Sequence, residues 1–122
     1  MRYPGLAFVL FALVACRELP GACTEIGCND GLSVRVEGSP PGPWEIDVAA
    51  GSTTHTFACP AGNNCQAAFF AGFLPTSVTV TVRANGKTQE HPNLTPTPRV
   101  TRPNGSACPP ECQQPFVTVS LP

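Results

Sequence analysis

Short stretches of alternating apolar and polar residues predict β-strands along most of the chain. The clearest stretch runs from Ser77 to Ala84, where three valines occupy every second position and threonine or arginine the positions between. The segment from Trp44 to Val48 has the same period, with Glu45 and Asp47 opposite its apolar side chains. Because successive side chains point to opposite faces of a strand, each segment predicts one buried face and one face in water.

Further strands follow from weaker versions of this pattern. The segments are Leu32 to Glu37, Thr53 to Cys59, Gln66 to Phe70, Lys87 to His91, Arg99 to Arg102 and Phe116 to Leu121. Asn85-Gly86 predicts a type I′ hairpin turn, and the prolines in residues 92 to 98 indicate a crossing loop or an irregular edge. With 15 Pro and 11 Gly and no helical period after the first residues, the expected fold is all-β. We expect a small, disulfide-stapled antiparallel Greek-key β-sandwich of about seven strands.

The first residues have a different pattern, that of an export signal. Arg2 is followed by an uninterrupted apolar run from Leu6 to Val14 and by the small residue Ala15. This run is too short to span a bilayer, which takes roughly 20 apolar residues, and polar residues follow at once. It therefore predicts a removable signal peptide over residues 1–15.

The end of that segment, Leu13-Val14-Ala15-Cys16, resembles the lipobox of bacterial lipoproteins. The resemblance implies that the thiol of Cys16 receives a diacylglyceryl group and that the signal is cut before this residue. The partner would then be a membrane, held through the acyl chains on Cys16, because each buried methylene contributes about 0.8 kcal/mol. In this family Asp after the modified cysteine favours retention at the inner membrane in some bacteria, so Arg17 tilts the expected location toward the outer membrane. Ordinary cleavage, with Cys16 free or paired, is the alternative.

The remaining cysteines fall into three close pairs. They are Cys23 with Cys28, Cys59 with Cys65, and Cys108 with Cys112. None has the two-residue spacing of a metal knuckle or a thioredoxin-like motif, so disulfides are the expectation for an exported domain. Removing Cys16 from the seven cysteines leaves an even number, which agrees with this.

The predicted strand order narrows the pairing of these cysteines. Residues 60 to 64 contain Gly and two Asn, which suit a chain reversal, so we prefer a bond from Cys59 to Cys65 across a hairpin. The other two pairs each precede a strand, one the first strand and the other the last. If these strands lie parallel and adjacent, the two pairs meet and staple the ends of the domain. Three local bonds within the pairs are the alternative.

The domains that we expect are therefore a signal peptide (1–15), a lipidated tether (16–22) and a β-sandwich (23–122). Within the sandwich, residues 41–48 (PGPWEIDV) resemble a strand of transthyretin-like and carboxypeptidase-regulatory-like modules. Such modules usually have no chemistry of their own, so the resemblance implies a structural or adhesive role.

Charge and the few candidate catalytic residues add little to this picture. The formal net charge of −1 does not favour nucleic acid as a partner. His55, with Asp47 or Glu45, is the only candidate constellation for a small hydrolase or a metal-dependent enzyme. We prefer to read Glu45 and Asp47 as the solvated face of a strand and His55 as an ordinary strand residue. The sequence predicts no cofactor, no metal ligands and no catalytic residue.

The apolar cluster Phe69, Phe70, Phe73 and Leu74 bears on binding. Adjacent phenylalanines in a strand face opposite sides, so one of Phe69 and Phe70 would be exposed to a partner unless a bulge buries both, which we expect. Our functional prediction is a membrane-anchored exported protein with a non-enzymatic binding or structural role in the cell envelope, with any protein partner unidentified. The alternatives are the small envelope enzyme above, or a disulfide-rich inhibitor or carbohydrate-binding domain. These last two would need an exposed loop between Cys59 and Cys65 or an exposed Trp44.

Overall fold

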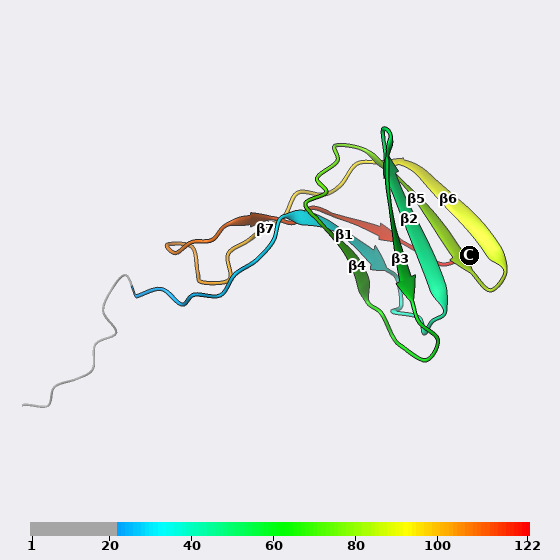
Figure 1. Cartoon of the computed structure of the whole chain (residues 1–122), viewed down its shortest axis with the longest axis horizontal. Helices are drawn as coiled ribbons and strands as arrows, with labels where there is room; N and C mark the ends of the chain where they lie inside the picture. The colour runs from blue at the N-terminus through cyan, green and yellow to red at the C-terminus, as the bar shows by residue number, and fades with distance from the viewer. Residues whose placement is uncertain (1–21) are drawn as a thin grey trace, which may run out of the picture.

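The computed structural model describes residues 22–122, and this part of the chain contains strands and no helix (Figure 1). The strands are β1 (Gly31–Val36), β2 (Trp44–Ala50), β3 (Thr53–Cys59), β4 (Ala67–Ala71), β5 (Val78–Ala84), β6 (Lys87–Leu94), β7 (Val100–Thr101), β8 (Cys112–Gln113) and β9 (Phe116–Val119). The predicted signal peptide, Cys16 and all but the last residue of the predicted tether lie outside the described residues.

Seven of the strands form the two layers of a sandwich. One sheet has the order β4-β1-β9 and the other the order β3-β2-β5-β6, while β7 and β8 pair as a separate ribbon. The chain passes between the layers after β1, β3, β4 and β6, whereas β2–β3 and β5–β6 are hairpins within one sheet; such crossings between layers are typical of Greek-key sandwiches. The predicted disulfide-stapled β-sandwich is confirmed.

The core lies between the two sheets and is lined by the residues that the alternation predicted. Leu32 and Val34 of β1, Ile46 and Val48 of β2, and Val80 of β5 have no exposed surface. Intervening residues of β2 and β5 are half-buried on the outer face of their sheet. Trp44 is also buried, and its indole N–H donates to the carbonyl of Pro40 at 3.0 Å, so the buried polar atom keeps a partner.

The first and last strands of the sandwich lie side by side and parallel. Ser33 of β1 is paired with Phe116 of β9, and the pairing continues to Val36 and Val119. This arrangement brings the outer cysteine pairs together, and the bonds are Cys23–Cys108 and Cys28–Cys112. Figure 1 shows residues 22–30 running beside the β7 ribbon at one end of the molecule. Either bond alone closes a loop of more than 80 residues, which stabilises the fold by about 4 kcal/mol in the chain-entropy model. The second bond then closes only a short ring and adds less.

The third disulfide, Cys59–Cys65, closes the reversal between β3 and β4, as preferred from the sequence. Gly42 packs against this loop and donates its N–H to the carbonyl of Asn63 at 2.8 Å. A Cβ at position 42 would overlap the backbone of Cys59 and Pro60, so only glycine fits here.

The structure corrects several sequence predictions at strand ends. The second strand of the β5–β6 hairpin continues past His91 and Pro92 to Leu94. Of the two alternatives predicted for residues 92 to 98, a crossing loop or an irregular edge, the beginning of the segment follows the second. Pro92 is tolerated because β6 is the edge of its sheet and needs no donor on its free side. Asn85 and Gly86 both have positive φ, as the predicted type I′ turn requires. The strand predicted from Arg99 to Arg102 is shorter in the structure, where it is β7. Its partner β8 was not predicted, because a strand of two residues is too short to show an alternating pattern.

The face assignment of β5 predicts different costs for two neighbouring substitutions. Val80→Asp places a carboxylate in a fully buried position and should lower the free energy of unfolding by more than about 3 kcal/mol. Thr79→Asp, on the outer face, should cost under about 1 kcal/mol. Urea denaturation of both variants measures the difference, and equal losses would contradict the register.

The contact between Gly42 and the disulfide loop predicts a second pair of effects. Gly42→Ala should lower the free energy of unfolding by about 2 kcal/mol or more, because the loop must move to admit the methyl group. Gly27→Ala is the matched control, since a Cβ there has no atom within 4 Å. A thermal or urea scan in which both variants match the wild type would show that the loop adapts freely.

Candidate functional site

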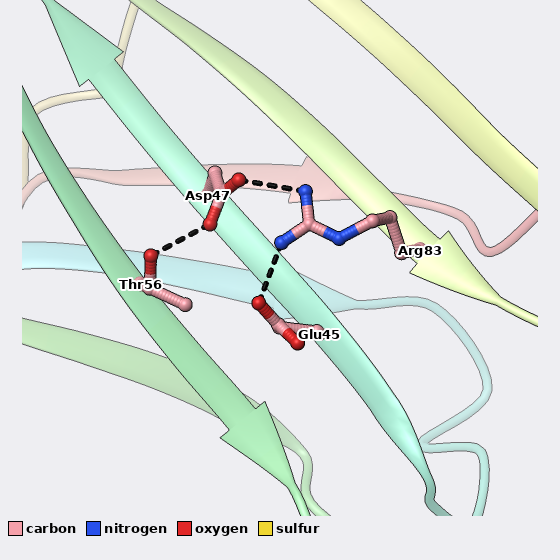
Figure 2. Close-up of polar contacts among 4 residues, drawn as sticks. All are labelled: Glu45, Asp47, Thr56 and Arg83. Carbon is pink, nitrogen blue, oxygen red and sulfur yellow. Dashed lines mark hydrogen bonds and ion pairs between the residues drawn. The ribbon is translucent and has the colours of Figure 1, made fainter.

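The outer face of the four-stranded sheet holds a network of charged and polar side chains (Figure 2). Glu45 and Asp47 project from β2, and Arg83 from the neighbouring β5. The guanidinium of Arg83 contacts Asp47 Oδ2 at 2.7 Å through Nη1 and Glu45 Oε1 at 2.5 Å through Nη2. On the other side, the hydroxyl of Thr56 on β3 donates to Asp47 Oδ1 at 2.7 Å. Three adjacent strands are therefore cross-linked on this face.

This network fixes Asp47 in its ionised form. The hydrogen bond from Arg83 lowers the pKa of Asp47, and the bond from Thr56 lowers it further. The same two carboxylates raise the pKa of Arg83. A carboxyl group that stays ionised cannot donate a proton at neutral pH. Ion pairs thus join β2 to β5, and Glu45 and Asp47 lie on the outer face of β2, the face that the alternation predicted for them.

His55 lies on the opposite face of the sheet from these carboxylates. It is paired with Val48, and its ring contacts Phe73 edge-on with centroids 4.7 Å apart. His55 therefore does not assemble with Asp47 or Glu45, and the candidate hydrolase constellation is not formed. Among residues 22–122 no group of three or more His, Cys, Asp and Glu side chains could hold a metal ion.

The loop from Pro60 to Asn64 is exposed and held at both ends by the disulfide. Beside it, a groove of about 630 Å³ runs to the β5–β6 turn and includes Glu45, Arg83 and Lys87 in its lining. Trp44 also borders this groove but is only 3% exposed. It is therefore not available as a stacking platform for a sugar.

The outer face of the three-stranded sheet is the more apolar of the two outer faces. Phe70 is buried in the core, but Phe69 points outward and is 42% exposed, so the expected burial of both rings through a bulge is wrong. The reason is that β4 pairs with β1 in regular register from Gly31 to Arg35, and without a bulge adjacent side chains take opposite faces. Gly31 accommodates Phe69, whose ring would overlap a Cβ at that position.

Two arginines flank a second ring on the same face. The guanidinium carbon of Arg35 lies 3.8 Å from the centroid of Phe116, and that of Arg99 lies 5.7 Å from it. Arg35 comes from β1, next to β9, and Arg99 from the segment on the other side of β9, where Thr97 is bridged to Phe116. We call Arg35, Arg99 and Phe116 the Phe116 cluster. Both arginines can make cation–π contacts with one ring.

The sequence did not single out the Phe116 cluster. The alternation of apolar and polar residues in the sequence places Arg35 and Phe116 on the outer faces of their strands, so the outward position of both could have been predicted. Arg99 lies outside any strand, and its approach to Phe116 depends on the bridge at Thr97. Nothing in the local sequence specifies this bridge.

Comparisons of the chain with protein-family models, with curated proteins and with solved structures found no match. Among the described residues no helix has the length and apolar character needed to cross a membrane.

The ion-paired state of Asp47 predicts how stability depends on pH. Its pKa in the folded protein lies below the ordinary value of 3.8, so its contribution is complete above that pH and is lost as the pH falls through the folded pKa. Asp47→Asn should therefore reduce the loss of stability on acidification from about pH 6 to about pH 2. The measurement is the urea midpoint across this range.

Glu37→Gln is the control for this prediction. Glu37 is exposed and forms no ion pair among the described residues, so its removal should leave the acid slope unchanged. A slope that changes equally in both variants would assign the effect to net charge rather than to the network.

Proposed function

We propose that this protein is an exported lipoprotein, held on a bacterial membrane through acyl chains on Cys16, with a non-enzymatic binding or structural role in the cell envelope. The observation that carries the proposal is the pairing of the cysteines. All six cysteines of the described chain are joined in disulfides. The seventh, Cys16, lies in the Leu13-Val14-Ala15-Cys16 motif and has no cysteine left to pair with inside the chain.

The disulfides also support an oxidising compartment. Cytosolic proteins keep their thiols reduced, whereas exported domains retain such bonds. A chain that folds with two bonds of sequence separation 85 and 84 depends on that environment for the closure of its ends. The outer membrane is the location favoured by Arg17 in the lipoprotein resemblance.

Chain length places the stapled end of the domain close to the anchor. Seven residue steps separate Cys16 from Cys23, and a fully extended chain spans at most about 3.6 Å per residue, or about 25 Å in all. A force applied at the anchor would reach the folded part at Cys23, and the first disulfide would transmit it to Cys108. The staple thus protects the sandwich from unravelling at its first strand.

A binding role is supported by the outer face of the three-stranded sheet. It presents Phe69 and the Phe116 cluster, and aromatic and arginine side chains are enriched where proteins bind partners. The resemblance of residues 41–48 to transthyretin-like modules points to the same kind of role.

An inhibitor role is the second candidate, favoured by the exposed loop between Cys59 and Cys65. Rigid, disulfide-held loops bind with little loss of conformational entropy. The buried Trp44 gives no corresponding support to carbohydrate binding, and the position of His55 gives none to the envelope enzyme.

The lipid anchor predicts that Cys16→Ser abolishes incorporation of labelled palmitate and moves the protein from the membrane fraction to the soluble fraction. Without the thiol there is no site for the diacylglyceryl group, and the hydrophobic attachment is lost. The measurement is label per molecule of protein after metabolic labelling and fractionation.

Cys23→Ser is the control for loss of a cysteine as such, and it should keep the label because the lipobox is intact. Equal palmitate incorporation in wild type and Cys16→Ser would refute the anchor.

A further inference from the structure

We propose that the Phe116 cluster is a binding site for a phosphate group, with Arg35 and Arg99 as the ligands of its oxygens. The inference rests on the proposed binding role of this face and names the chemistry of the ligand. It does not depend on the lipid anchor.

The distribution of ion pairs is the first reason. Of the four arginines in residues 22–122, Arg83 is paired with Glu45 and Asp47, and Arg102 with Glu111 at 2.9 Å. Within the same residues, Arg35 and Arg99 have no carboxylate at ion-pair distance. Two like charges gathered at one ring repel each other unless an anion offsets them.

The geometry of the two guanidiniums is the second reason. The guanidinium of Arg35 lies against the Phe116 ring, and that of Arg99 lies within cation–π distance of the same ring. The Nε of Arg99 is buried and has no hydrogen-bond partner among the described residues. A buried donor of this kind is costly when left unpaired. A ligand oxygen would accept charge-assisted hydrogen bonds from the outer N–H groups of the guanidinium, and it would reach Nε only if the Arg99 side chain turned.

A groove beside Phe116 offers space next to the cluster, which it adjoins through the Phe116 ring because neither arginine is part of its lining. It measures about 250 Å³ and is lined by Leu94, Thr95, Thr97, Phe116, Val117 and Thr118. Its polar side chains are hydroxyls, which can donate to an anion, and its lining includes no carboxylate that would repel one.

The charge of the cluster selects phosphate over a single carboxylate. A phosphate monoester carries about −1.5 to −2 at pH 7, which matches two guanidiniums, whereas a carboxylate carries −1. Arginine also binds phosphate oxygens in bidentate fashion. The phosphate could belong to a lipid headgroup or to a soluble phosphate ester, and the two sources share this chemistry.

The test is a titration with inorganic phosphate of the full chain carrying Cys16→Ser. Binding is monitored through the NMR chemical shifts of the backbone amides of residues 33–36 and 116–119. Sodium chloride at matched ionic strength is the reference. We expect saturable shifts with phosphate alone. Arg35→Gln and Arg99→Gln should each weaken binding about tenfold or more, as expected for losing one hydrogen bond to a charged group.

Arg102→Gln is the matched control, because this guanidinium is already paired with Glu111, and it should leave phosphate binding unchanged. Arg35→Lys and Arg99→Lys retain the charge and serve if a glutamine variant fails to fold; each should bind phosphate more weakly than wild type. Shifts that do not saturate, that follow chloride equally, or that weaken as much in Arg102→Gln would overturn the proposal.

A second arm separates the two sources of phosphate. Binding of the protein to vesicles of phosphatidylcholine with phosphatidic acid is compared with its binding to vesicles of phosphatidylcholine alone. Both measurements are made first with Arg35 and Arg99 in place and then with both replaced by glutamine. Binding to the first vesicles that is lost in the variant assigns a headgroup, and phosphate binding without vesicle binding assigns a soluble ester. Vesicle binding without saturable phosphate binding would contradict a defined site. Because Cys16 is replaced throughout, failure here leaves the palmitate experiment unaffected.

Discussion

The parallel pairing of β1 with β9 joins the two ends of the folded chain, and the other main features depend on it. It places Leu32 and Val34 beside Val117 in one layer of the core. It also brings the cysteines ahead of β1 within bonding distance of those ahead of β9, so that two disulfides close the domain. Parallel pairing of terminal strands requires a long crossover, and here the whole sandwich is that crossover. Bringing the two ends of the chain together costs conformational entropy. The two disulfides lower this cost because they hold the ends together in the unfolded chain as well.

The same pairing divides the outer surfaces into two chemically different faces. On the four-stranded sheet, three adjacent strands carry Glu45, Asp47, Thr56 and Arg83 in one satisfied network. On the three-stranded sheet, Arg35 stands next to β9 and meets Phe116 instead of a carboxylate. Arg83 in the first setting is neutralised by two carboxylates, whereas Arg35 and Arg99 in the second have no carboxylate at ion-pair distance among the described residues. This contrast distinguishes the ion-paired face from the face that we propose binds a ligand.

Much of the fold was predictable because it follows from local pattern. The alternation in β2 and β5 located their buried faces, and Asn85-Gly86 located its hairpin. Prediction failed where a neighbour decided the outcome. Phe69 is exposed because β4 keeps regular register with β1. The prolines after His91 left a crossing loop and an irregular edge both open, and the place of β6 at the edge of its sheet decided between them for Pro92. The preferred interpretation of His55 as an ordinary strand residue agrees with the structure, where it is paired with Val48 on the face opposite Asp47.

The sequence by itself determined which residues of the regularly alternating strands face inward, where the chain turns and that its cysteines fall into three groups, since these depend on periods and spacings of a few residues. Only the tertiary structure decided which groups of cysteines are joined and which arginines remain unpaired. These depend on contacts between segments far apart in the chain, such as Cys28 with Cys112 and Arg35 with Phe116. Local sequence sets the face of a strand, but the neighbour that the strand meets is set by the packing of the whole chain, because many sheet orders satisfy the same alternation.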